Sequence, residues 1–177
     1  MRNTVALAAV LLISIMAYVI FFFGQEGSSL SDDDIAFAIP DTAEVGRIVL
    51  TPVVKTQPQT SLTLSRTRTT GWQLNKTYPA LIPRVDRLLQ VMQSLALREV
   101  FNEAAQANAQ TFLRTVRTDV EMYDHAGNLI KAYSVGSETP DAQGTIMQMD
   151  GSDIPVSVEM PGLVGFVKAN YSVDPLY

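Results

Sequence analysis

The sequence predicts an α+β protein, in which a single N-terminal transmembrane helix precedes an antiparallel β-sheet domain with about two packed helices. Three observations lead to this prediction. An uncharged apolar run opens the chain, several later segments alternate apolar and polar residues, and two segments between them carry apolar residues at helical spacing. Alternation with a period of two is typical of half-buried strands, and a spacing of three to four residues is typical of amphipathic helices. We expect about six to eight strands in the sheet.

The apolar run extends from Thr4 to Phe23, a length of 20 residues without a charge. A helix of this length spans about 30 Å, the thickness of the hydrocarbon core of a bilayer. The apolar part of a signal peptide is usually about 7–15 residues long and ends near a cleavage site of small residues. Here the run ends in three phenylalanines. A retained membrane anchor is therefore favoured over a cleaved signal peptide or a buried core helix.

The flanks of the run predict its orientation. Arg2 and the terminal amine precede it, and the first charged residues after it are Glu26 and the acidic run Asp32–Asp34. Positive charge favours the cytoplasmic side of a membrane, so we expect a cytoplasmic N-terminus and an outer C-terminal domain. The small residues Ala6, Ala9, Ser14 and Ala17 are candidate contacts with a neighbouring membrane helix, because small side chains allow close approach.

We predict three regions along the chain: residues 1–23 with the anchor, a flexible acidic linker over 24–38, and an α+β domain over 39–177. About 140 residues is an ordinary size for one domain with one core. The chain has no cysteine and one histidine, which excludes disulfides, a thiol nucleophile and a site with several histidines. Beyond Arg2 there are 12 basic and 18 acidic residues. Because acidic residues are in excess, we expect no basic surface of the kind that binds nucleic acid.

The predicted domain opens with three strands, in "GRIVLTPV", "TSLTLSRT" and "WQLNKTYP". In the second, Leu62 and Leu64 alternate with polar residues, and in the third Trp72 and Leu74 share a face. A turn at Thr70-Gly71 joins the last two segments. Short strands joined in order by turns are typical of an antiparallel meander.

Two helices are predicted next, with "LREVF" between them as a short strand or connector. The first lies in "PRVDRLLQVMQSLAL", and Pro83 suits its first turn. Its apolar stripe contains Val85, Leu88, Leu89, Met92, Leu95 and Ala96. The second begins after Asn102, which is a good N-cap residue. Its predicted stripe contains Phe101, Ala105, Ala109, Phe112 and Val116.

The last third of the chain returns to the period of strands. "TDVEMYD" and "NLIKAYSVG" flank a hairpin connection over residues 124–128, in which Gly127 supplies a positive φ. "GTIMQM" and "IPVSVEM" are two more predicted strands, and Pro155 indicates that the second begins at an edge or at a strand start.

No constellation of residues predicts catalysis, so we expect a protein that is not an enzyme and that needs no cofactor or metal. His125 beside Asp124 stands in the predicted hairpin, where nothing in the sequence orients the imidazole. The pairs Glu121 with Asp124 and Glu138 with Asp141 have the residue types of a glycosidase couple, but spacing alone does not place them across a sugar. The turn "MDGSD" lacks the remaining ligands of a calcium loop.

Two features are candidates for binding. The polar loop "GSETPDAQG", Gly136 to Gly144, is typical either of an extended hairpin connection, which we favour, or of a binding loop. Trp72, Tyr78 and Phe101 stand at the ends of apolar segments, which favours core packing, and an exposed aromatic patch for a partner is the alternative.

Several segments in order resemble the bacterial membrane-anchored domain-of-unknown-function family 4340. They are Gly71-Trp72 with its strand, the "YPA" step at 78–80, "VGSETPDAQGTIM" at 135–147 and "GSDIP" at 151–155. The similarity covers roughly Thr42 to Phe166. The resemblance implies one N-terminal helix, an outward domain, and genes beside export-type ABC transporter components, and it supplies no catalytic residues. Members of the family often continue beyond the matched region, so we expect a short member or a missing tail.

The sequence and the resemblance together predict a non-enzymatic accessory or scaffold subunit of a bacterial envelope complex. We expect it to be a single-pass protein of the inner membrane with a periplasmic domain. Its predicted partners are the lipid bilayer and other integral membrane proteins, with no nucleic acid and no small-molecule substrate. The alternative is a periplasmic binding module for an envelope glycan or peptide.

Overall fold

The computed structural model describes Ser14, Met16 and residues 31–55, 60–67, 71–162 and 167–172. The chain divides into two compact units, Met1–Leu30 and Ser31–Tyr177. In the first unit Ser14 and Met16 are helical. Within the part of the chain that the structure describes, no helix is long and apolar enough to span a bilayer. The rest of the predicted anchor, including Ala6, Ala9 and Ala17, lies outside the described residues.

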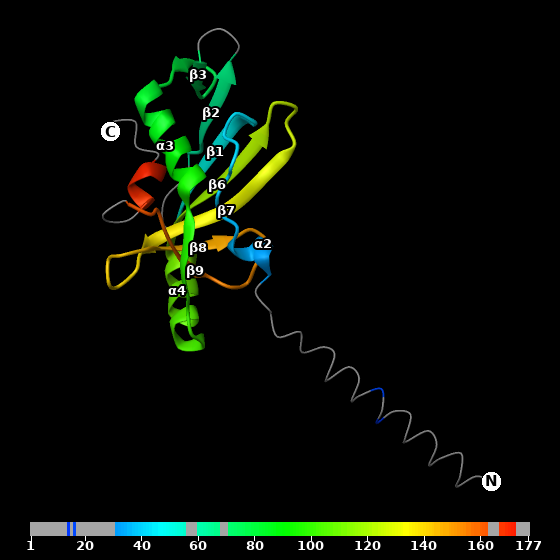
Figure 1. Ribbon diagram of the computed structural model, residues 1–177, viewed down its shortest axis with the longest axis vertical. Helices are drawn as coiled ribbons and strands as arrows, with labels where there is room; N and C mark the ends of the chain where they lie inside the picture. Colours follow the sequence, from blue (N-terminus) through cyan, green and yellow to red (C-terminus); the bar gives the residue numbers. More distant parts are fainter. Residues whose placement is uncertain are drawn as a thin grey trace, which may run out of the picture. The chain divides into compact units, whose positions relative to one another are not determined.

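The second unit contains one antiparallel sheet, with nine strands among the described residues in the order β4-β3-β2-β1-β6-β7-β8-β9-β5 (Figure 1). Its first half is the predicted meander, which consists of β1 (Val45–Val54), β2 (Leu62–Thr67), β3 (Gly71–Leu74) and β4 (Tyr78–Pro79). Its second half contains β6 (Val116–Asp124), β7 (Leu129–Glu138), β8 (Thr145–Met149), β9 (Val156–Glu159) and β5 (Ala96–Val100). The prediction of an α+β fold with a large antiparallel sheet is confirmed.

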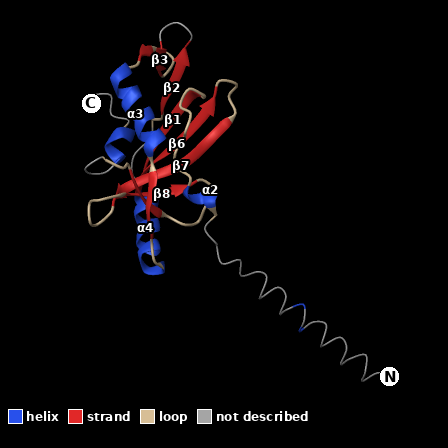
Figure 2. Cartoon of the chain, in the orientation of Figure 1, coloured by secondary structure: helices blue, strands red, loops and turns tan. Residues whose placement is uncertain are grey.

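The helical elements are α2 (Asp32–Ile35), α3 (Ile82–Ser94), α4 (Glu103–Thr115) and the 3₁₀ helix η1 (Val167–Tyr171) (Figure 2). The two long helices were predicted, and Asn102 caps α4 by accepting the N–H of Ala105 at 3.0 Å. α3 leads from β4 at one edge of the sheet to β5 at the opposite edge. The chain therefore crosses one whole face of the sheet between these two strands.

The two long helices cover opposite faces of the sheet. Tyr133 and Val135 of β7 point to the face that carries η1, where the hydroxyls of Tyr133 and Tyr171 meet at 2.9 Å. Gly136 belongs to the other face, where a Cβ atom added to it would lie 2.8 Å from Cδ2 of Leu113 in α4. Leu113 thus packs directly on the backbone of β7. The added atom would also lie 3.0 Å from the carbonyl oxygen of Ile146, so a larger residue at position 136 would require Leu113 or β8 to shift.

Residues 31–38 correct the prediction of a flexible linker over 24–38. Ser31 caps α2 through a capping box with Asp34, and Phe37 is 1% exposed. The ammonium group of Lys131 on β7 donates to the carbonyl oxygens of Ala36 and Ala38. Acidic composition indicated a solvated linker, but the burial of one aromatic ring holds this segment on the domain.

The predicted apolar stripe of α4 is confirmed at Ala109 but is wrong at Phe112 and Val116. Phe112 and Val116 are 53% and 40% exposed, whereas Ala109 and Leu113 are buried against Ile146. Successive residues in a helix are about 100° apart, so Phe112 and Leu113 cannot both face the sheet. Leu113 faces it because Gly136 leaves space for its branched end.

Candidate functional site

An apolar cleft of about 540 Å³ lies between α3, the meander strands and η1. Its volume falls in the range of about 300–1,000 Å³ that is usual for binding sites. Leucine side chains from three strands line it, together with the β4–α3 connection, one side of α3 and the end of η1. The lining residues are Leu50, Leu62, Leu64, Leu74, Pro79, Ala80, Leu81, Pro83, Arg84, Val85, Arg87, Leu88, Ala169, Asn170 and Ser172.

The pairing of the strands explains why leucines gather there. Leu50 on β1 lies opposite Leu62 on β2, and Leu64 on β2 lies opposite Leu74 on β3. Paired residues share a face of a sheet, so these four side chains form one apolar surface. The apolar stripe of α3 faces this surface.

Leu81, which lines the cleft, and the nearby residues Ile82 and Tyr78 have large apolar side chains that remain in solvent. Leu81 and Ile82, at the start of α3, are 67% and 42% exposed, and Tyr78 on β4 is 64% exposed. Exposed apolar residues that adjoin a cleft are a common mark of a binding surface, whereas single exposed residues are not. Through Leu81 the apolar surface of the cleft reaches into solvent.

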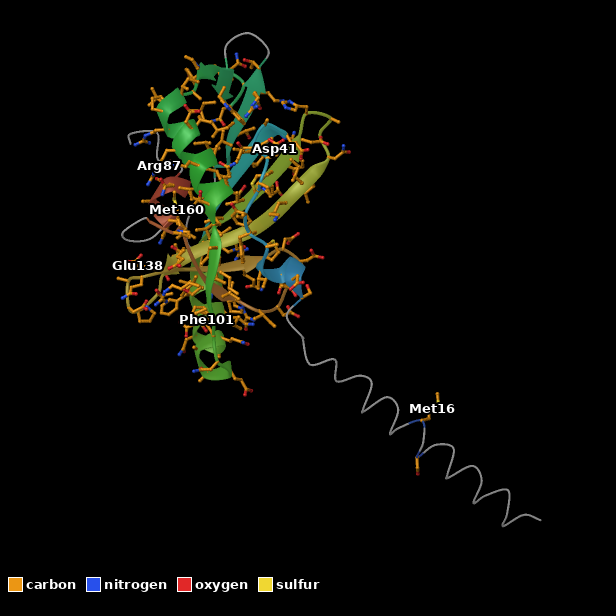
Figure 3. The ribbon with its side chains drawn as sticks, viewed as in Figure 1. Met16, Asp41, Arg87, Phe101, Glu138 and Met160 are labelled. Atoms are coloured by element: carbon orange, nitrogen blue, oxygen red, sulfur yellow. The ribbon has the colours of Figure 1, made fainter. Side chains whose placement is uncertain are left out.

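Two arginines on α3 line the same cleft. Arg84 and Arg87 are three residues apart, so they stand on one side of the helix, and Figure 3 labels Arg87 beside α3. Arg87 donates to the side chain of Gln90 at 3.1 Å. The ion pairs in the described part of the chain are made by Arg98 and Arg117, so neither cleft arginine has an acidic partner within 4.0 Å there.

The three aromatic residues considered as a binding patch lie in different environments in the structure. Trp72 is 5% exposed and packs under Arg66, whose guanidinium carbon lies 5.0 Å from the ring centroid. Phe101 is half-buried against the cluster of Ala109, Leu113 and Ile146, outside the meander. Tyr78 alone of the three is largely exposed. Trp72 and Phe101 therefore pack as the favoured interpretation predicted, and no patch joins the three.

His125 is exposed at the hairpin tip, as predicted, but it is not without a partner. Its Nε2 atom lies 2.9 Å from the carbonyl oxygen of Ala43. Asp124 does not contact the imidazole and instead accepts the backbone N–H and the side-chain amide of Asn128, both at 2.8 Å. These bonds hold the pKa of Asp124 below its ordinary range. Asp124 therefore stabilises the turn, and His125 joins the turn to the segment before β1.

The loop between β7 and β8 is held by its own hydrogen bonds. Buried Thr139 accepts the N–H of Gly144 at 3.0 Å and donates to Asp141 at 2.5 Å. Arg98 on β5 pairs with Asp141 at 2.7 Å. The bond from Thr139, then the N–H of Gln143 and the nearby Arg98, lower the pKa of Asp141. The polar side chains at this position thus close a hairpin, the favoured prediction.

The other acidic residues considered as catalytic candidates also lie outside the cleft. Glu121 accepts the phenolic O–H of Tyr123 at 3.0 Å, and Glu138 is exposed at the end of β7. Glu121 and Asp124 both belong to β6, whereas the cleft lies along β1, β2 and β3.

Sequence reasoning missed the cleft because its lining leucines have the same spacing as core leucines. One signal was present: Leu81 and Ile82 precede Pro83 and fall outside the apolar stripe of α3. Large apolar residues without a place in a stripe are candidates for an exposed surface. Asn170 of η1 and Ser172, just after it, had no such signal.

No family model, curated protein or solved structure matches this chain. The resemblance to family 4340 therefore stays a prediction.

Proposed function

We propose that this protein is a non-enzymatic accessory or scaffold subunit of a bacterial inner-membrane complex, and that its periplasmic domain binds a partner protein through the cleft. The apolar run Thr4–Phe23 supports the membrane location. The family resemblance favours a transporter as the complex. The observation that carries the proposal is the apolar cleft in whose lining Leu81 is largely exposed.

The apolar character of this surface favours a protein partner. Burial of apolar area contributes about 25 cal/mol for each Å² removed from water, and the centres of protein interfaces are their most apolar part. Leu81 is 67% exposed, so most of its side chain is available for burial against a partner. A sugar would need more hydrogen-bonding groups than the side chains of Arg84, Arg87, Asn170 and Ser172 offer in this cleft.

The second candidate function is a binding module for an envelope peptide or glycan. The volume of the cleft, about 540 Å³, favours it, because small ligands occupy sites of this size. This function requires a soluble ligand, whereas the first requires a stable neighbour in the membrane. Recovery of the complex from membranes separates the two.

The test is purification of the full-length protein from its native membrane in mild detergent, with two matched variants. Leu81→Glu places a charge at the mouth of the cleft, and Phe112→Glu places one on α4, where the side chain is similarly exposed. We expect a membrane protein in stoichiometric amount with the wild type and with Phe112→Glu, and at least about a tenfold loss with Leu81→Glu.

Two results would contradict the proposal. One is recovery of the wild-type protein as a lone monomer. The other is an equal loss of the partner with both variants, which would show that the cleft has no special part in the association. Thermal unfolding of each variant controls for damage to the fold.

A further inference from the structure

We infer that the occupant of the cleft is an apolar peptide segment of the partner that carries carboxylates, and that these carboxylates pair with Arg84 and Arg87. The inference rests on the proposed function, because it names the chemistry of the partner at the same cleft. Its basis is the combination of an apolar floor with two arginines on one side of a helix.

Within the described part of the chain, neither arginine of the cleft has an acidic partner, in contrast to two other arginines of the domain. Arg98 pairs with Asp141 at 2.7 Å, and Arg117 pairs with Asp119 at 2.7 Å. Arg84 and Arg87 lack such a pair among the described residues, although the chain carries 18 acidic and 13 basic residues. Positive charge left unpaired at a cleft of an acidic chain is complementary to an anionic ligand.

The apolar floor of the cleft favours anions that also carry apolar groups. Leu50, Leu64 and Leu74 present hydrocarbon to whatever occupies it. A strongly hydrated anion, such as a free phosphate or a nucleotide, would lose water there without gaining apolar contact. An occupant that satisfies both parts has apolar side chains for the floor and carboxylates for the arginines.

The outer surface favours a peptide over a lipid. Leu81 lines the cleft and is largely exposed, and Ile82 and Tyr78, close to it in the chain, are exposed as well. A peptide with several apolar side chains covers such a surface, whereas a single acyl chain fills a narrow enclosed pocket. An acidic segment would also reach Arg84, which lines the same cleft and is exposed.

The experiment selects random dodecapeptides, displayed on phage, against the full-length protein in detergent micelles. We expect the recovered peptides to combine leucine or phenylalanine with aspartate or glutamate. The double variant Arg84→Glu with Arg87→Glu should reverse the charge preference toward lysine and arginine. Arg114→Glu, a similarly exposed arginine on α4, is the matched control and should leave the selection unchanged.

A variant with neutral side chains tests the same inference if the charge reversal disturbs folding. Arg84→Gln with Arg87→Gln should weaken the binding of a selected acidic peptide by about fivefold, which corresponds to about 1 kcal/mol for the two exposed ion pairs together. The emission of Trp72, the one tryptophan of the chain, reports whether each variant retains its packed meander.

The outcomes separate the two proposals. Failure to select any peptide that depends on Leu81 would contradict the proposed function itself. Selection of apolar peptides with no acidic preference, unchanged by the double variant, would overturn this inference and leave the proposed function standing. Displacement of an acidic peptide by phosphatidylglycerol vesicles but not by phosphatidylcholine vesicles, lost in the double variant, would assign the cleft to an anionic lipid instead.

Discussion

Three buried aromatic rings connect distant parts of the domain at the level of single residues. The rings of Tyr133 and Tyr171 meet edge to face with centroids 6.2 Å apart, and the ring of Phe37 lies 5.7 Å from that of Tyr133. The three side chains are at most 2% exposed. They join the segment before β1, the centre of β7 and the helix η1, which forms one wall of the cleft.

The hydroxyl pair of Tyr133 and Tyr171 gives the first prediction. Replacement of either tyrosine by phenylalanine should lower the free energy of unfolding by about 1–3 kcal/mol, because it leaves the other hydroxyl buried without its partner. Replacement of both should cost less than the sum of the two single changes. Urea unfolding of the wild type, the two single variants and the double variant measures these free energies. Strictly additive costs would contradict the account.

The same pair predicts how stability depends on alkaline pH. Burial raises the pKa of Tyr133 and of Tyr171 above the ordinary range. The unfolded chain ionises these phenols near pH 10 while the folded protein keeps them neutral. Their contribution is therefore complete below about pH 10 and is lost as the pH rises beyond it.

Urea midpoints measured between pH 8 and pH 11 test this expectation. The wild type should lose stability above about pH 10 more steeply than the variant with both tyrosines replaced by phenylalanine. Equal slopes for the two proteins would show that the buried pair does not contribute to the alkaline loss.

At the scale of elements, the segment before β1 is part of the domain. Phe37→Ala should lower the free energy of unfolding by about 3–5 kcal/mol, the usual cost of removing a buried phenylalanine ring. Phe112→Ala, at a side chain that is 53% exposed, is the matched control and should cost much less. Similar unfolding free energies for the two variants would restore the interpretation of residues 31–38 as a linker.

Local patterns explain which elements could be predicted from the sequence. Leu62 and Leu64 identified β2, and the stripe of Val85, Leu88 and Met92 identified α3, because periodicity is a property of neighbouring residues. The pairing of β5 with β9 joins residues about 60 positions apart, and no local pattern specifies it. The sequence therefore predicts the fold class but not the order of the strands.

The same limit applies to the site. Phe112 and Leu113 are both apolar and adjacent, so spacing alone could not decide which of them packs on Gly136. Leu62 and Leu64 were correctly predicted to share a face of β2, yet whether that face is covered or open depends on how α3 and η1 lie across it. The open cleft is therefore a property of tertiary packing rather than of any one segment.

At the scale of the whole domain, the two edge strands of the sheet are poor sites for pairing with a strand of another protein. β4 is two residues long and contains Pro79, which lacks an N–H group. β5 has a register shift between Leu97 and Glu99. Short strands, prolines and bulges hinder the addition of another strand. The apolar cleft is the better candidate for association, and our account depends on it.

Site-specific photo-cross-linking in the native membrane tests that claim most directly. A photoreactive phenylalanine analogue replaces Leu81 in one full-length variant and Phe112 in another, because the two positions are comparably exposed. The account predicts one discrete protein adduct from position 81 that is lost when Arg84 and Arg87 are also changed to glutamate, and none from position 112. Absence of an adduct from position 81, or equal adducts from both positions, would contradict it.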